Sequence, residues 1–187
     1  GLSWVDIHEI PVFQAPVNVV PESSDSRIVE FSNLPDTFDC KAVSDRWVHS
    51  DRSLRKLRWR YQEQPGVRYR IFGILESSGD VYAYLVAKRY KHQIQVVDIF
   101  PPDDGDAGVA LVAAAVRSFQ DEGGIEGVGM WLNPSTAAHH ALEKIGFAPG
   151  KPVTYFGGLL LDDQPPLGVK LLDFRNWHYT MGDSDNF

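Results

Sequence analysis

The stretch from Gln93 to Glu122 constrains the fold more than any other, because it carries the pattern of a strand, a turn and a helix in immediate succession. Most residues of Ile94–Phe100 are apolar and several are β-branched, which predicts a strand covered on both faces. Pro101-Pro102 ends that strand, because proline has no N–H to donate to a sheet. Ala107–Phe119 is almost entirely apolar or small, which predicts a helix packed on most of its circumference. An anion beyond the end of the strand would meet the free N–H groups and the positive dipole end of this helix.

The composition predicts a soluble, acidic protein of one domain, or of one domain with an appendage. The 187 residues are 43% hydrophobic, which is enough for a core, and the net charge of −7 argues against nucleic acid as a partner. The single cysteine, Cys40, excludes an intrachain disulfide and a multi-cysteine zinc site, and it fits a reducing compartment, so a cytoplasmic location is expected. No apolar run approaches the roughly 20 residues that span a bilayer, and no signal-peptide pattern is present, so no membrane partner is expected. The start at Gly1 without methionine indicates a fragment or a processed chain.

The sequence pattern of the first half of the chain predicts short strands around one helix. Residues 1–37 are expected to form two short strands, separated by His8–Pro11, and then a polar linker. Ser53 has the chemistry of an N-cap for the helix that follows it. Tyr69–Leu75 and Val81–Tyr90 flank a short turn and are expected to form a hairpin.

A basic run crosses this helix and continues into the next strand. Arginine and lysine alternate with aromatic and apolar residues between Arg46 and Arg70. The run fits a surface for phosphate or another polyanion. It also fits an amphipathic helix whose apolar residues Leu54, Leu57 and Tyr61 pack inward while the arginines are solvated. Both interpretations stay open, although the net charge points away from nucleic acid.

The second half continues with alternating strands and helices. After another short strand, Ser135 is expected to cap a helix over Thr136–Ile145, and Gly146 to end it. Val153–Leu161 is expected to be a further long strand. The last residues, 165–187, are aromatic and polar, and we expect them to lie over the surface of the domain rather than in its core.

The order strand, turn, buried helix, strand and helix, together with residues 133–147 (NPSTAAHHALEKIGF), resembles the second half of the GNAT acyltransferase superfamily. The resemblance implies an α/β (mixed α+β) fold over residues 38–164, with a GNAT-like, twisted, largely antiparallel sheet and helices on both faces. It also implies acetyl-CoA or another acyl-CoA as cofactor, whose pantetheine and pyrophosphate that family holds with its fourth strand and the helix after it. By this comparison, the cofactor-binding residues would be Ile99, Phe100, Gly105, Ala107, Gly108, Val109 and Asn133.

Two further stretches narrow the resemblance. Residues 57–74 (LRWRYQEQPGVRYRIFGI) and 176–187 (NWHYTMGDSDNF) are similar to GNAT-type proteins associated with bacterial surface-polysaccharide genes, which often carry two GNAT-like halves in tandem. Residues 1–37 would then be the tail of a preceding half. The resemblance therefore implies a small-molecule amine as one partner, and a preceding half or a second copy of the chain as the other.

The chain departs from the family pattern at the cofactor site. Gly105 stands where the pyrophosphate loop of the family has glutamine or arginine, and Asp103, Asp104 and Asp106 flank it. At an effective dielectric constant of about 20, a carboxylate about 4–6 Å from a pyrophosphate costs roughly 3–4 kcal/mol. A helix terminus contributes only about 0.3–1 kcal/mol per interaction. Repulsion therefore exceeds attraction unless the aspartates point away or cap the helix. Leu142, further on, stands where the family has a tyrosine that protonates the leaving thiolate.

Acyl transfer needs a base, donors for the oxyanion and an acid. Asp98, within the central strand, is the candidate base or water-orienting group, although an aspartate there also fits a hydrogen bond to a neighbouring loop. The backbone N–H groups near Ile99 and Phe100 are the candidate oxyanion donors. Because leucine has no proton to give, the candidate acids are Tyr155 and His140.

The histidines of the helix expected over Thr136–Ile145 do not predict a metal site. His139 and Glu143 are four residues apart, as are His140 and Lys144, so each pair would be in contact on a helix. One histidine and one glutamate are too few to hold a metal ion. No metal is therefore expected, and the histidines are expected at the surface.

These observations leave two functions of different classes. The first is an acyl-CoA-dependent N-acyltransferase that acts on an amino sugar or similar small amine. The second is a catalytically inactive GNAT-shaped module, serving as the structural or ligand-binding half of a tandem protein. The acidic loop and Leu142 favour the second, whereas the intact order of strands and helices permits the first.

Overall fold

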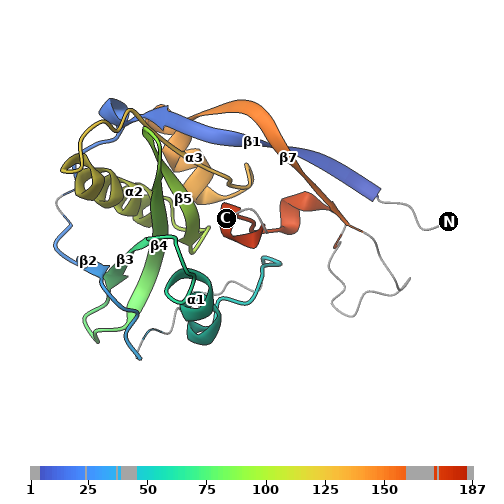
Figure 1. Cartoon of the computed structure of the whole chain (residues 1–187). Coiled ribbons are helices and arrows are strands. Elements are labelled where there is room, and N and C mark those ends of the chain that lie inside the picture. The colour runs from blue at the N-terminus through green and yellow to red at the C-terminus, as the bar shows by residue number, and fades with distance from the viewer. Residues whose placement is uncertain are drawn as a thin grey trace.

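One open sheet organises the chain in the computed structural model, which describes residues 5–23, 25–36, 38, 46–158, 171 and 173–184 (Figure 1). Within these residues the strands are β1 (Val5–Pro16), β2 (Ile28–Phe31), β3 (Arg70–Leu75), β4 (Val81–Tyr90), β5 (Gln93–Phe100), β6 (Gly127–Met130) and β7 (Ala148–Gly158). The α-helices are α1 (Leu54–Tyr61), α2 (Gly105–Gln120) and α3 (Ala137–Lys144), and the short 3-10 helices are η1 (Val17–Val19), η2 (Phe174–Asn176) and η3 (Met181–Asp183). The strand order is β2-β3-β4-β5-β6-β1-β7.

Helices cover both faces of this sheet. The helices α2 and α3 lie on one face, where Leu111 and Leu142 belong to one apolar cluster. Helix α1 lies on the other face and contributes Leu57 and Tyr61 to a second cluster. Neighbouring strands are antiparallel, except that β5 and β6 pair in parallel. The predicted mixed α+β class, with a largely antiparallel sheet between helices, is thus confirmed. Among the helices that the structure describes, none has the length and apolarity needed to cross a membrane.

Strand β1 is one strand of 12 residues, where the sequence predicts two short ones. It lies between β6 and β7 and is antiparallel to both. Its register with β7 shifts on both sides of Pro11, which stands opposite Pro152. Because proline cannot donate to the ladder, the strand accommodates it at an irregularity instead of ending there. The long strand predicted over Val153–Leu161 begins earlier, at Ala148, and residues 159–161 lie outside the described part of the chain.

The predicted strand–turn–helix unit is present as β5 and α2, and its helix begins against α3. A Cβ atom at Gly105 would lie 2.8 Å from the Cβ of Ala141 and 2.9 Å from the carbonyl oxygen of Ala137. These distances are shorter than carbon–carbon and carbon–oxygen contacts allow, so glycine is needed for the two helices to approach this closely.

Helix α3 begins one residue later than predicted. Thr136, not Ser135, is the N-cap, and its hydroxyl accepts the N–H of His139 at 3.1 Å. The carbonyl of the Asn133 side chain already accepts the N–H of Ser135 at 2.8 Å, which holds Ser135 in the preceding turn. At the other end of the helix Gly146 has a φ of +109°, as predicted for a glycine that ends a helix.

Residues 173–184, which we call the C-terminal segment, are packed into the domain. His178, Tyr179, Thr180 and Met181 are all buried, and Met181 belongs to the same apolar cluster as Tyr61 of α1. The expected surface position therefore does not hold for these four residues. Figure 1 shows the segment beside β5, on the side of the sheet that α1 covers.

The burial of Leu142 predicts how a tyrosine at this position would behave. Leu142 is completely buried between α3 and the sheet, so the added ring atoms and hydroxyl of Leu142→Tyr must displace core side chains. We expect Leu142→Tyr to lower the free energy of unfolding by about 1–3 kcal/mol, and Leu142→Met to lower it by less than about 1.5 kcal/mol. Urea unfolding monitored by tryptophan fluorescence measures both. A tyrosine variant as stable as the methionine variant would mean that this part of the core has spare volume.

Candidate functional site

The two parallel strands at the centre of the sheet part before β5 ends. Pairing between β5 and β6 runs from Gln93 opposite Gly127 to Val96 opposite Met130, whereas β5 continues to Phe100. The remaining residues of β5 keep their pairing with β4 on the other side. The sheet is therefore open between β5 and the chain that follows β6.

The C-terminal segment occupies this opening. His178 donates a hydrogen bond from Nε2 to the carbonyl oxygen of Ile99 in β5, at 2.8 Å. Asn133, just beyond β6, donates from its side-chain amide to the carbonyl oxygens of Phe174 and Trp177, each at 2.7 Å. The carbonyl group of Ile99 and the side-chain amide of Asn133 are therefore already hydrogen-bonded within the chain, and they are not free for the pantetheine arm that the resemblance implies.

A buried polar network fixes the segment to β5 and α1. Asp98 accepts hydrogen bonds from Nε and Nη2 of Arg52, at 3.4 and 3.3 Å, and from the hydroxyls of Tyr61 and Tyr84, each at 3.1 Å. Arg52 also donates to Asp183 of the segment at 3.1 Å. Every side chain of this network except Asp183 is at least nine-tenths buried, so these charges depend on one another and not on water.

Burial and the neighbouring charges shift the pKa values of the network in different directions. Complete burial raises the pKa of Asp98, and the positive charge of Arg52 limits that rise. Burial also acts on Asp183, but the charge of Arg52 and the hydrogen bond from Ser50 outweigh it and lower the pKa of Asp183. Asp183 is therefore the carboxylate of this network that stays ionised most readily.

A cavity of about 620 Å³ lies against the C-terminal segment. Its wall combines aromatic rings with a few polar groups, which is the usual character of a small-molecule site. The lining residues are Ile10, His49, Ser50, Trp131, Thr154, Tyr155, Phe156, Trp177, His178, Tyr179, Thr180, Asp183 and Ser184.

His178 is a polar residue of this wall, and only one of its two ring nitrogens is hydrogen-bonded to a described residue. Its Nε2 carries the hydrogen donated to Ile99, and no described residue is hydrogen-bonded to its buried Nδ1. Complete burial and the nearby charge of Arg52 lower the pKa of His178 well below its ordinary value, so the imidazole is neutral. In that state the buried Nδ1 is a hydrogen-bond acceptor.

The N-terminus of α2 does not fit a pyrophosphate. Oδ1 of Asp104 accepts the N–H of Ala107 at 2.9 Å, and the backbone carbonyl of Asp104 accepts the N–H of Gly108 at 3.1 Å. Oδ2 of Asp104 accepts the hydroxyl of Tyr82, and Asp103 accepts the indole N–H of Trp47 at 2.8 Å. The helix end is thus satisfied by a carboxylate of its own chain, which also repels a second anion.

The structure places the candidate catalytic residues apart. Tyr155, with 66% of its surface exposed, lines the cavity of the C-terminal segment. Asp98 is buried in the network behind that cavity and is not part of its wall. His140 lies on α3 and lines a separate groove with Gly105 and Asp106, at the N-terminus of α2. Three of the predicted residues therefore belong to three different environments.

The candidate cofactor residues are likewise divided. Ile99 and Phe100 are buried at the end of β5, where the C-terminal segment covers the carbonyl of Ile99. Asn133 is buried and holds the segment. The residues Gly105, Ala107, Gly108 and Val109 all lie in the first turns of α2.

Several arginines of the basic run form ion pairs or hydrogen bonds with other parts of the chain. Besides Arg52, Arg58 binds Asp36 at 2.7 Å, Arg60 donates to the carbonyl oxygen of Ser184, and Arg70 binds Glu30 at 2.7 Å. This favours the amphipathic-helix interpretation, with Ser53 as the predicted N-cap and Leu57 and Tyr61 packed inward.

Sequence reasoning missed His178, Asp183 and the role of Arg52. The tail did carry a signal, since its polar and aromatic residues are unusually dense for a terminal surface segment. Nothing local in the sequence indicates that Asp183 faces Arg52, because the two are 131 positions apart.

No family model, no curated protein and no solved structure matches this chain.

Removing Arg52 should strongly destabilise the domain. The variant Arg52→Met leaves Asp98 and Asp183 buried together without their cation, which is expected to cost about 3–5 kcal/mol of unfolding free energy. The matched control is Arg55→Met, an exposed arginine in the first turn of α1, for which we expect a change within about 0.5 kcal/mol. Urea titration measures both. A loss below about 1 kcal/mol for Arg52→Met would mean that the network contributes little to stability.

His178 should make the domain less stable in mild acid. Its pKa is lowered on folding, so below about pH 6.5 the unfolded chain binds a proton that the folded chain does not, and stability falls as the pH falls. Between pH 7.5 and 5.5 the unmodified chain should lose about 1.4 kcal/mol more unfolding free energy than His178→Gln, which does not titrate. Urea titrations at the two pH values measure the difference. The exposed variant His92→Gln serves as the control and should lose as much as the unmodified chain.

Proposed function

We propose that this chain is a ligand-binding module with the outline of an acyltransferase, and that its cavity beside the C-terminal segment takes an amino sugar or a similar small amine. The observation that carries the proposal is the wall of that cavity. It brings aromatic rings, a carboxylate and a neutral imidazole together around one space of about 620 Å³. These groups suit a ligand that has both apolar ring edges and polar, partly cationic substituents.

Each side of the cavity offers a different interaction. Tyr155 and Trp177 present aromatic faces, to which an ammonium group is attracted. The carboxylate of Asp183 keeps 22% of its side-chain surface exposed and can bind the same group more directly. The resemblance to tandem proteins of bacterial surface-polysaccharide genes supports an amino sugar as this ligand, and the single cysteine supports a cytoplasmic location.

An acyl-CoA-dependent N-acyltransferase is the second candidate. The parting of β5 and β6 favours it, because a cofactor arm needs such an opening. Two observations weigh against it: His178 is bonded across the opening, and Asp104 caps the helix at which a pyrophosphate would bind. The first candidate needs no cofactor and is therefore the better supported.

Calorimetric titration of the chain with glucosamine, and with N-acetylglucosamine as the amine-blocked analogue, tests the proposal. Glucosamine should bind and the blocked sugar should bind more weakly. Tyr155→Ala should weaken glucosamine binding roughly fivefold, for a lost aromatic contact of about 1 kcal/mol. Val153→Ala, on the same strand, also exposed and outside the cavity wall, should not change it. Absent binding, or equal binding by both variants, would refute the proposed ligand site.

Acetyl-CoA distinguishes the two candidates. If the chain is a transferase, acetyl-CoA at about 100 times its dissociation constant should add roughly 2.7 kcal/mol of stability in a thermal-shift assay. We expect no shift at millimolar acetyl-CoA. A clear shift, together with release of free thiol in the presence of glucosamine, would favour the transferase.

A further inference from the structure

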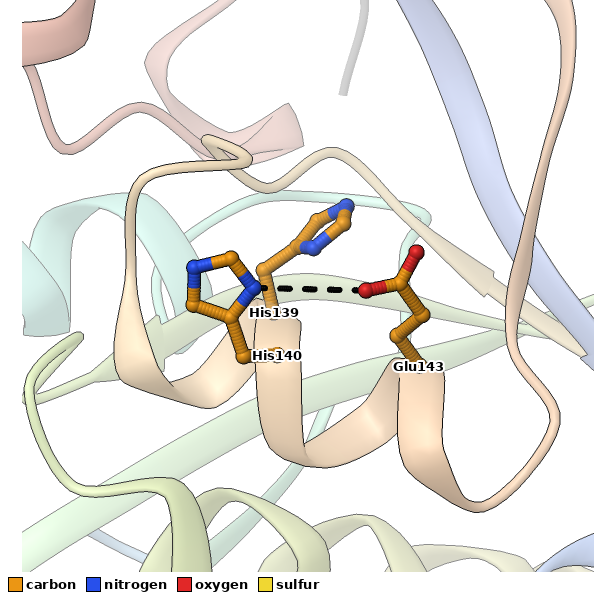
Figure 2. A group of neighbouring side chains, drawn as sticks. All are labelled: His139, His140 and Glu143. Atoms are coloured by element: carbon orange, nitrogen blue, oxygen red, sulfur yellow. Dashed lines mark ion pairs between the residues drawn. The ribbon is translucent and has the colours of Figure 1, made fainter.

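Helix α3 carries three metal-ligating side chains on one side. His139, His140 and Glu143 each offer one ligand atom, and these atoms lie within 4.8 Å of one another. Figure 2 shows the three side chains together above the helix, with the ion pair between His140 and Glu143 drawn as a dashed line. Nδ1 of His140 and Oε2 of Glu143 are 3.9 Å apart. The sequence prediction paired His139 with Glu143 alone and so counted two ligands where the helix presents three.

His139 supplies the observation that points to a ligand. It is buried rather than at the surface as expected, with 9% of its area exposed, and its ring is stacked on Phe13 of β1 at 4.0 Å between centroids. Its Nδ1 is buried, and no described residue is hydrogen-bonded to it. Buried polar atoms are nearly always satisfied, so an exception calls for a bound partner.

We propose that His139, His140 and Glu143 bind one divalent transition-metal ion, with zinc as the best match. Two imidazole nitrogens and one carboxylate oxygen are a donor set that zinc accepts, and they leave its fourth position for water or a ligand. The stacked ring of His139 is the fixed member of the set. His140 and Glu143 expose 61% and 58% of their side chains, so both can rotate toward the ion.

The spacing of the three atoms is compatible with this ion after small movements. Tetrahedral zinc with bonds of about 2.0–2.1 Å holds neighbouring ligand atoms roughly 3.3 Å apart. The observed 3.9 Å between His140 and Glu143 is slightly longer, and closing it requires only the turning of two exposed side chains. The acidic groove beside the helix favours a cation, since His140 shares it with Asp103, Asp104 and Asp106, whereas Lys144 opposes it.

Titration of the tag-free, chelator-treated chain with Zn²⁺ by calorimetry tests the site. We expect one ion per chain with a dissociation constant of about 10 µM or below, and visible absorption of tetrahedral Co²⁺ when cobalt replaces zinc. Glu143→Gln and His140→Ala should each weaken zinc binding at least tenfold. Both residues are exposed, and unchanged thermal unfolding of the metal-free variants confirms that they fold.

The control is His92→Ala, an exposed histidine in the turn between β4 and β5, which should change the dissociation constant by less than about twofold. No zinc binding at about 100 µM metal would overturn the proposal. Undiminished binding by the double variant His140→Ala/Glu143→Gln would also overturn it, because the ion would then sit elsewhere. Neither result bears on glucosamine binding, which concerns a different cavity.

Discussion

The buried ion pair between Arg52 and Asp98 joins parts of the chain that lie far apart in the sequence. It joins the residues before α1 to the central strand β5, and through Asp183 it adds the C-terminal segment. Two carboxylates and one guanidinium leave the cluster with one excess negative charge, which the hydroxyls of Tyr61, Tyr84, Thr180 and Ser50 stabilise. Breaking any member leaves a charge in a medium of low dielectric constant, so the cluster favours a single arrangement of three distant segments.

That arrangement decides what kind of site the fold can offer. Where β5 and β6 part, the sheet receives the chain's own residues, since His178 bonds Ile99 and Asn133 bonds the C-terminal segment. The C-terminal segment therefore closes the opening between β5 and the chain that follows β6. The cavity lies beside this segment, and aromatic residues of β7 and of the segment line it.

Local patterns in the sequence predicted the elements well, and long-range pairing explains what they missed. The apolar helix α2, the hairpin of β3 and β4, and the caps at Ser53 and Gly146 follow from residues close together in the chain. The position of the C-terminal segment depends on partners 41 to 133 residues away, for which no local pattern exists. The ion pairs of the basic run were missed for a related reason, because an arginine that pairs across the fold has the same local sequence context as a solvated one. Asp104 is an intermediate case. Its residue type allows it to cap helix α2, and the structure shows that it does so.

The place of β1 has a consequence for how this sheet can assemble. Its neighbours β6 and β7 begin at Gly127 and Ala148, so nearly the whole domain must be made before β1 can pair. Contacts this distant in sequence slow the folding of a domain, because a long loop must close before any pairing energy is gained. During synthesis β1 is thus made well before the strands that pair with it, and its unpaired edges are open to other chains until β6 and β7 have been made.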